Sequence, residues 1–86
     1  MSIEKYRLQI DEIDLEMMEL FKKRMELSKK IGDYKKANHL PVTDEKREHE
    51  IIIKRKNAMS DEKLWPYYEV FIHQIFNLSK AYQHDE

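Results

Sequence analysis

The stretch IEKYRLQIDEIDLEMMELFKKRMELSKKIGDY, residues 3–34, decides the fold of this chain. Large apolar or aromatic side chains recur in it at steps of three and four, with one gap: Ile3, Tyr6, Ile10, Ile13, Met17, Leu20, Leu27, Ile31 and Tyr34. They fall on the a and d positions of a heptad repeat, which places them along one stripe of a helix. Ser2 is a suitable N-cap and Asn38 a suitable stop. We therefore expect one helix of about 36 residues, about 54 Å long at about 1.5 Å per residue.

The length of this helix predicts a partner chain. A compact chain of 86 residues has a radius of gyration of about 12 Å and a diameter of about 30 Å. The helix must then project beyond any core that its own chain forms, with its apolar stripe facing water. A second copy covers such a stripe by two-fold symmetry, so we predict an obligate homodimer.

A second, shorter helix is predicted after a loop at residues 38–43. Asp44 or Thr43 is suited to cap this helix, which we expect to end near Asn57. The run Ile51-Ile52-Ile53 is typical of a strand when taken alone. It lies between strongly charged residues with no turn-forming residue nearby, however, and this context favours a helix.

A third helix is predicted after a connection at residues 58–63. It should begin near Trp65, because Pro66 is tolerated in the first turn of a helix but not in its interior. Its expected apolar stripe is Tyr68, Phe71, Ile75, Leu78 and Tyr82. The sequence thus predicts an all-α fold of one very long, one short and one medium helix, intertwined with a second copy.

Composition excludes several classes of protein. Sixteen Lys and Arg against 17 Asp and Glu give a net charge of −1, whereas nucleic-acid and acidic-membrane binders carry a basic excess. Cysteine is absent, which excludes disulfides and thiolate nucleophiles. No apolar run approaches the ~20 residues of a membrane span. Met1 to Lys5 show no cationic region followed by an apolar stretch, so we expect a cytoplasmic protein.

Arg24 interrupts the apolar stripe of the first helix. It occupies heptad position a between Met17 and Ile31, where an unpaired charge is costly and cannot be removed by loss of a proton. One interpretation is that the side chain reaches the rim or pairs with a carboxylate. The other is a pocket for an anionic ligand, since the planar guanidinium suits a carboxylate or a phosphate.

Further polar residues favour the pocket. Lys35 follows Arg24 by eleven residues, about three helical turns, on a neighbouring stripe. Ser79 and Gln83, four residues apart, extend a face that begins with Ile72 and Phe76. Other polar positions of interest are Arg7, Arg47 and Glu48. Each of these residues, taken singly, is also compatible with an ordinary surface position, and only the joint pattern points to a binding site.

The familiar catalytic motifs are missing. Gly32 is the single glycine, so a phosphate-binding loop is excluded, and there is no GxSxG. The pairs Glu45/His49 and Glu69/His73 are spaced i,i+4, unlike the Glu-x-x-His of di-iron bundles, and we expect neither a metal nor a cofactor. Cationic and amide groups without an obvious nucleophile or general base suit a reaction driven by orientation and electrostatic stabilisation.

This constellation resembles the all-helical class of chorismate mutases. The resemblance extends from about Ile3 to Gln83 and rests on four stretches: RLQIDEID from Arg7, KKRMELSKKIGDYK ending at Lys35, PVTDEKRE, and Ser79 with Gln83. It implies that residues 1–86 form a single domain of this family, an intertwined homodimer of three-helix chains. The implied activity is the rearrangement of chorismate to prephenate in the biosynthesis of phenylalanine and tyrosine, with no cofactor.

The resemblance also implies a role for each polar position. Arg24 and, from the partner subunit, Arg7 would hold the two carboxylates of chorismate, with Ser79 assisting. Lys35 and Gln83 would be the catalytic residues, donating hydrogen bonds to the ether oxygen. The remaining substrate-binding residues would be Glu48 and the backbone of Asp44, at the ring hydroxyl, and Arg47, which adds positive potential.

Three alternatives remain open at the level of sequence. A lyase that removes pyruvate from isochorismate resembles this chain in its arginines and lysine, but tends to lack the residues at Glu48 and Ser79, which are present here. A mutase acting on amino-substituted chorismate is conceivable, since Glu48 could accept a hydrogen bond from an amine. In a non-catalytic coiled-coil dimer, Arg24 would only set the register.

Overall fold

The computed structural model describes residues 2–84, and its first element is a helix of 35 residues, α1 (Ile3–Ala37). Ser2 precedes it in an extended conformation, although the Ser2 hydroxyl makes no capping bond. Asn38 ends it, with its side-chain Nδ2 donating to the carbonyl of Tyr34 at 2.8 Å. Lys35 and Lys36 in the last turn complement the helix dipole. The expected long helix and both of its ends are confirmed.

The second helix, α2 (Glu45–Met59), is capped by Asp44. Asp44 Oδ1 accepts from the backbone N–H of Arg47 at 3.0 Å, which satisfies one of the free donors of the first turn. Ile51 to Ile53 are helical, as their charged context predicts. The helix ends two residues later than expected, where Ser60 adopts a left-handed conformation with φ of 49°.

The third helix, α3 (Trp65–His84), begins where Pro66 predicts. The turn before it is organised by Asp61, whose Oδ1 accepts from the backbone N–H groups of Lys63 and Leu64 at 3.1 and 2.9 Å. The backbone N–H of Trp65 donates to the carbonyl of Asp61 at 2.9 Å. Asp61 therefore satisfies backbone N–H groups at the start of α3, where Leu64, the residue before the helix, has no polar side chain.

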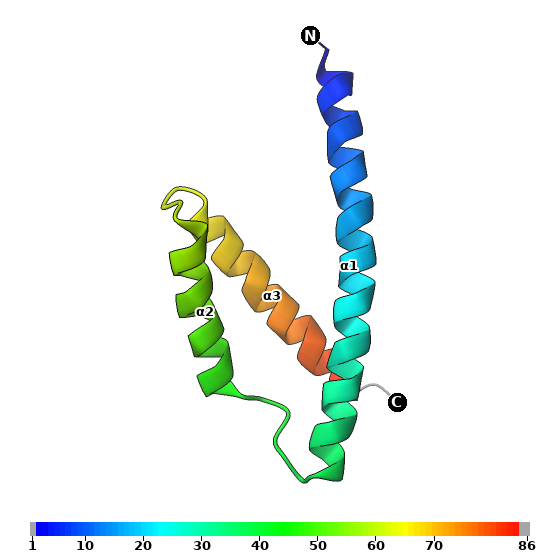
Figure 1. The fold of residues 1–86 in the computed structure, drawn as a ribbon, viewed down its shortest axis with the longest axis vertical. Coiled ribbons are helices and arrows are strands. Elements are labelled where there is room, and N and C mark those ends of the chain that lie inside the picture. Colours follow the sequence, from blue (N-terminus) through cyan, green and yellow to red (C-terminus); the bar gives the residue numbers. More distant parts are fainter. Residues whose placement is uncertain (1, 85–86) are drawn as a thin grey trace.

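Helix α3 is in contact with both other helices: it begins beside the end of α2 and runs across to α1 (Figure 1). It packs against the C-terminal half of α1 and against α2. Within residues 2–84 the buried apolar side chains are Trp65, Ile72 and Phe76, all from α3. α1 contributes buried Ser28 and Gly32 to this contact. The N-terminal end of α1 extends past the other helices (Figure 1), and the long axis of the molecule is 56 Å.

The face of α3 that packs inward differs from the predicted stripe. Ile72, Phe76 and Ser79 are buried, whereas Phe71 and Leu78 of the predicted stripe are 48% and 46% exposed. Two apolar faces lie side by side on α3, and the heptad spacing alone does not say which one packs against its own chain. Phe71, Leu78 and Tyr82 of the predicted stripe are therefore exposed, while Tyr68 and Ile75 are half-buried.

The apolar stripe of α1 is also uncovered. Met17 is the least exposed of its nine side chains, and 47% of it is still accessible. The radius of gyration is 16.1 Å, against about 12 Å for a compact chain of this length. The accessible surface of 7543 Å² exceeds by about 2,000 Å² the roughly 5,500 Å² expected for a compact monomer of 10.6 kDa. Within residues 2–84, no helix has the length and apolar character that a membrane crossing requires.

Candidate active site

A cavity of about 450 Å³ lies between α1, the start of α2 and the C-terminal half of α3. Its polar wall consists of Arg24, Ser28, Lys35, Asp44, Arg47, Glu48, Ser79, Lys80 and Gln83, and its apolar wall of Leu27, Ile31, Val42, Ile51 and Phe76. Seven of the eight polar positions singled out from the sequence therefore line this cavity. The volume and the mixture of apolar and convergent polar groups are typical of a small-molecule site.

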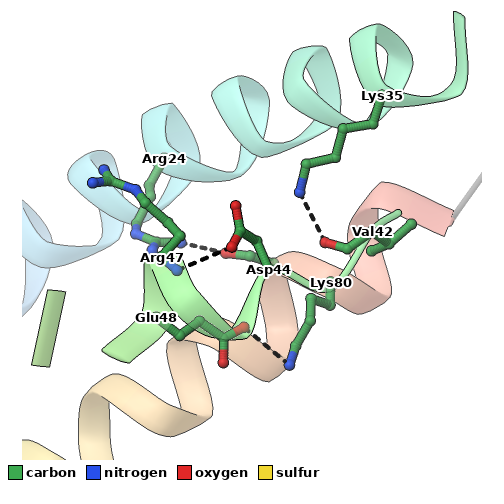
Figure 2. Close-up of polar contacts among 8 residues, drawn as sticks. Arg24, Lys35, Val42, Asp44, Arg47, Glu48 and Lys80 are labelled. Atoms are coloured by element: carbon green, nitrogen blue, oxygen red, sulfur yellow. Dashed lines mark hydrogen bonds and ion pairs between the residues drawn. The ribbon is translucent and has the colours of Figure 1, made fainter. Parts of the chain in front are cut away.

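Arg24 points toward α3 rather than into bulk solvent (Figure 2). Its Nη1 donates to the hydroxyl of buried Ser79, and within residues 2–84 no carboxylate forms an ion pair with it. Burial lowers the pKa of Arg24, the nearby charge of Arg55 lowers it further, and Tyr68 acts in the opposite direction. A guanidinium remains charged all the same, so Arg24 presents a positive charge with donors left for an anion.

Lys35 is held over the cavity by the loop between α1 and α2. Its Nζ donates to the carbonyl of Val42 at 2.8 Å (Figure 2). The bond joins the last turn of α1 to the loop seven residues later, and both side chains are half-buried. The ammonium is thus positioned near the cavity by an acceptor that carries no formal charge.

Asp44 and Arg47 lie at the start of α2. The carboxylate of Asp44 is engaged in capping the helix through the backbone N–H of Arg47 (Figure 2). Both side chains are exposed to solvent at the cavity edge. Arg47 therefore contributes charge at the rim and is not buried among the apolar residues.

Glu48 forms an ion pair with Lys80, a residue that the sequence did not single out. Lys80 Nζ lies 3.2 Å from Glu48 Oε2, and the side chains are 27% and 23% exposed (Figure 2). The pair joins α2 to α3 across the cavity wall. Lys80 follows Ser79 directly and precedes Gln83 by three residues, and that helical spacing is the signal that could have identified it.

Gln83 lies against Gly32, the single glycine of the chain. A Cβ at position 32 would lie 2.9 Å from Gln83 Cβ and 3.1 Å from its Cα, closer than ordinary contact allows. The end of α3 therefore approaches α1 only because residue 32 has no side chain. Gln83 Oε1 is buried and has no hydrogen-bond partner among the described residues, a costly arrangement for which a functional role is one explanation.

Arg7 is the predicted site residue that the chain does not bring to the cavity. It lies on an exposed part of α1, 17 residues before Arg24, which is about 25 Å along the helix. Within residues 2–84, α1 runs as one helix through both residues and keeps them apart.

The charges of the cavity suit an anionic ligand. Arg24, Lys35, Arg47 and Lys80 oppose two carboxylates, Asp44 and Glu48, so the wall carries a net charge of about +2, which favours a dianion. Phe76 and the aliphatic side chains offer an apolar surface for a ring. Residues 2–84 hold no group of three or more His, Asp or Glu side chains arranged to bind a metal ion.

Comparison with protein families finds a match. The family model described as chorismate mutase type II matches residues 6–84, nearly the whole chain. Neither the curated proteins nor the solved structures include a significant match to this chain.

Proposed function

The chain belongs to the chorismate mutase type II family, and we propose that the cavity between its three helices is where chorismate binds and rearranges. The family's activity is the isomerisation of chorismate to prephenate, a step of the shikimate pathway that leads to aromatic amino acids. The observation that carries the assignment of the site is the convergence of seven predicted polar residues on one cavity with a cationic excess.

Binding of the two substrate carboxylates is assigned to the arginines and Ser79. Arg24 offers a planar pair of donors suited to a carboxylate, and its contact with Ser79 fixes the direction of the guanidinium. Arg7 from the partner subunit would hold the other carboxylate. Arg47 at the rim adds positive potential that attracts a dianion.

Catalysis is assigned to Lys35 and Gln83. The reaction breaks a C–O bond and forms a C–C bond within one molecule, so no group is transferred and no covalent intermediate is needed. Confining the side chain of the substrate over its ring lowers the barrier by orientation. Negative charge grows on the ether oxygen as its bond lengthens, and the Lys35 ammonium together with the Gln83 amide N–H would stabilise it more in the transition state than in the substrate.

The ring hydroxyl is assigned to Glu48 and to the backbone of Asp44. Glu48 Oε2 faces Lys80, which leaves the other carboxylate oxygen as an acceptor. A hydroxyl donor bound there would fix the orientation of the substrate ring in the cavity.

A homodimer completes the site in this proposal. The excess accessible surface of about 2,000 Å² per chain corresponds to the interfaces of obligate dimers. An antiparallel copy of α1 would cover the exposed stripe and bring its Arg7 to the cavity.

A cytoplasmic location stays a prediction.

The activity is tested by incubating the purified protein with chorismate and following its ultraviolet absorbance. We expect chorismate to be lost and prephenate to form, with Lys35→Ala reducing the rate strongly and Lys30→Ala, an exposed lysine of the same helix, having little effect. Equal rates in Lys35→Ala and the unaltered protein would refute the assignment. Release of pyruvate from isochorismate at a comparable rate would favour the lyase instead.

Whether each active site contains residues from both subunits is tested by mixing two inactive variants. Arg7→Ala and Lys35→Ala chains, unfolded and refolded together in equal amounts, should form mixed dimers with one intact and one doubly damaged cavity. Random pairing then restores about a quarter of the unaltered activity. No recovery, together with a monomeric mass by analytical ultracentrifugation, would refute the shared site.

A further inference from the structure

The ion pair of Glu48 and Lys80 joins two helices at the wall of the cavity. Lys80 Nζ lies 3.2 Å from Glu48 Oε2, with about a quarter of each side chain exposed. The residues are 32 positions apart in sequence and both line the cavity (Figure 2). The pair is therefore tertiary and better shielded from solvent than the exposed i,i+3 pair of Glu19 and Lys22 on α1, so its charges interact more strongly.

Pairing changes what Glu48 can recognise. A lone carboxylate attracts a cation more strongly than a neutral donor. With an ammonium already beside Oε2, a second ammonium at the same carboxylate meets a like charge at short range, whereas a hydroxyl donating to Oε1 does not. Lys80 therefore makes the Glu48 subsite selective for a neutral donor.

We infer that Lys80 is a specificity-determining residue, which acts through Glu48 to favour a ring hydroxyl over a ring amine in the substrate. The inference rests on the proposed function, in which Glu48 binds the ring hydroxyl. The disfavoured substrate class is chorismate with an amino group in place of that hydroxyl, which is protonated at neutral pH.

The experiment compares two substrates in three proteins. The value of kcat/KM is measured for chorismate and for 4-amino-4-deoxychorismate with the unaltered protein, Lys80→Met and Lys80→Arg. Met keeps the length of the side chain without its charge, and Arg keeps the charge. We expect the preference for chorismate to fall about tenfold or more in Lys80→Met and to stay within about threefold in Lys80→Arg.

The outcomes separate this inference from the proposed function. An unchanged preference for chorismate in Lys80→Met overturns the role of Lys80, and so does an equal loss of that preference in both variants. Chorismate turnover by the unaltered protein would in either case still support the proposed function of the cavity. Absence of chorismate turnover in the unaltered protein overturns both. Circular dichroism monitors folding, and Lys80→Gln replaces Lys80→Met in the same comparison where the latter does not fold.

Discussion

Replacing Gly32 by alanine tests whether the close approach of α1 and α3 positions the amide of Gln83, which we propose acts in catalysis. The new Cβ would lie 2.9, 3.0 and 3.1 Å from Gln83 Cβ, Cγ and Cα. Ordinary contacts begin near 3.4 Å. Because Cα belongs to the backbone, rotation of the Gln83 side chain does not relieve the overlap, and the end of α3 must move by several tenths of an ångström.

Two opposing terms set the effect on stability. Ala in place of Gly in a helix gains about 1 kcal/mol, and overpacking at a close contact costs about 1–3 kcal/mol. We therefore expect the free energy of unfolding to fall by at most about 2 kcal/mol. The effect on activity should exceed the effect on stability, because a displacement of 1 Å at a reacting group lowers the rate up to about 10²-fold. For a few tenths of an ångström at Gln83 we expect kcat to fall about tenfold.

The assay is steady-state chorismate turnover together with thermal unfolding. If Gln83 acts on the ether oxygen in the transition state, kcat falls while KM changes little. Asp33→Ala is the matched control, since residue 33 is exposed and next to Gly32 and its change adds helix propensity without a new contact at Gln83. A Gly32→Ala protein whose kcat stays within about twofold of the unaltered value would refute the positioning role.

Three further predictions concern the cationic and amide groups of the cavity. Lys35→Ala should lower kcat about 10²- to 10³-fold, the usual loss for a donor aimed at developing negative charge, as measured by chorismate absorbance. Arg24→Lys should raise KM about tenfold, because an ammonium cannot replace the planar donors that face both Ser79 and a carboxylate; an unchanged KM would contradict this. In Gln83→Glu the new carboxyl, with an ordinary pKa of about 4.3, must be protonated to donate, so activity should rise as the pH falls from about 7 to 5. The unaltered protein should show a flat kcat between about pH 5 and 8, because an amide does not titrate and Arg24 stays charged although burial lowers its pKa. A parallel pH profile for both proteins would disprove the role of Gln83.

The elements of the fold were predictable because local signals define them. The heptad pattern marks α1, and Asp44 and Pro66 mark the starts of α2 and α3 within one residue. The packing of α3 was not predictable in the same way. It depends on Gly32 and Ser28 of α1, whose small size lets α3 approach closely. A heptad pattern is defined by large apolar residues and gives no information on small ones.

The candidate site was predictable where a residue breaks a pattern. Arg24 stands out because it interrupts an apolar stripe, and it does contact Ser79 in a cavity. Lys80 looks like any charged residue in a chain with 38% charged residues. Its helical spacing from Ser79 and Gln83 was the one available signal, and the contact with Glu48 appears only in the folded chain. Arg7 does not line the cavity of its own chain, and its proposed contact with the substrate requires the second chain of the proposed dimer.

The uninterrupted course of α1 from Arg7 to Lys35 gives the helix the role of a rigid spacer. In the proposed dimer its two ends serve different reaction centres, so the rise per residue fixes how far apart these centres lie. One inserted residue between Met17 and Met18 would rotate the two ends against each other by about 100° and disable both centres at once. Short insertions in this segment should therefore be tolerated far less than in the loop at residues 38–43.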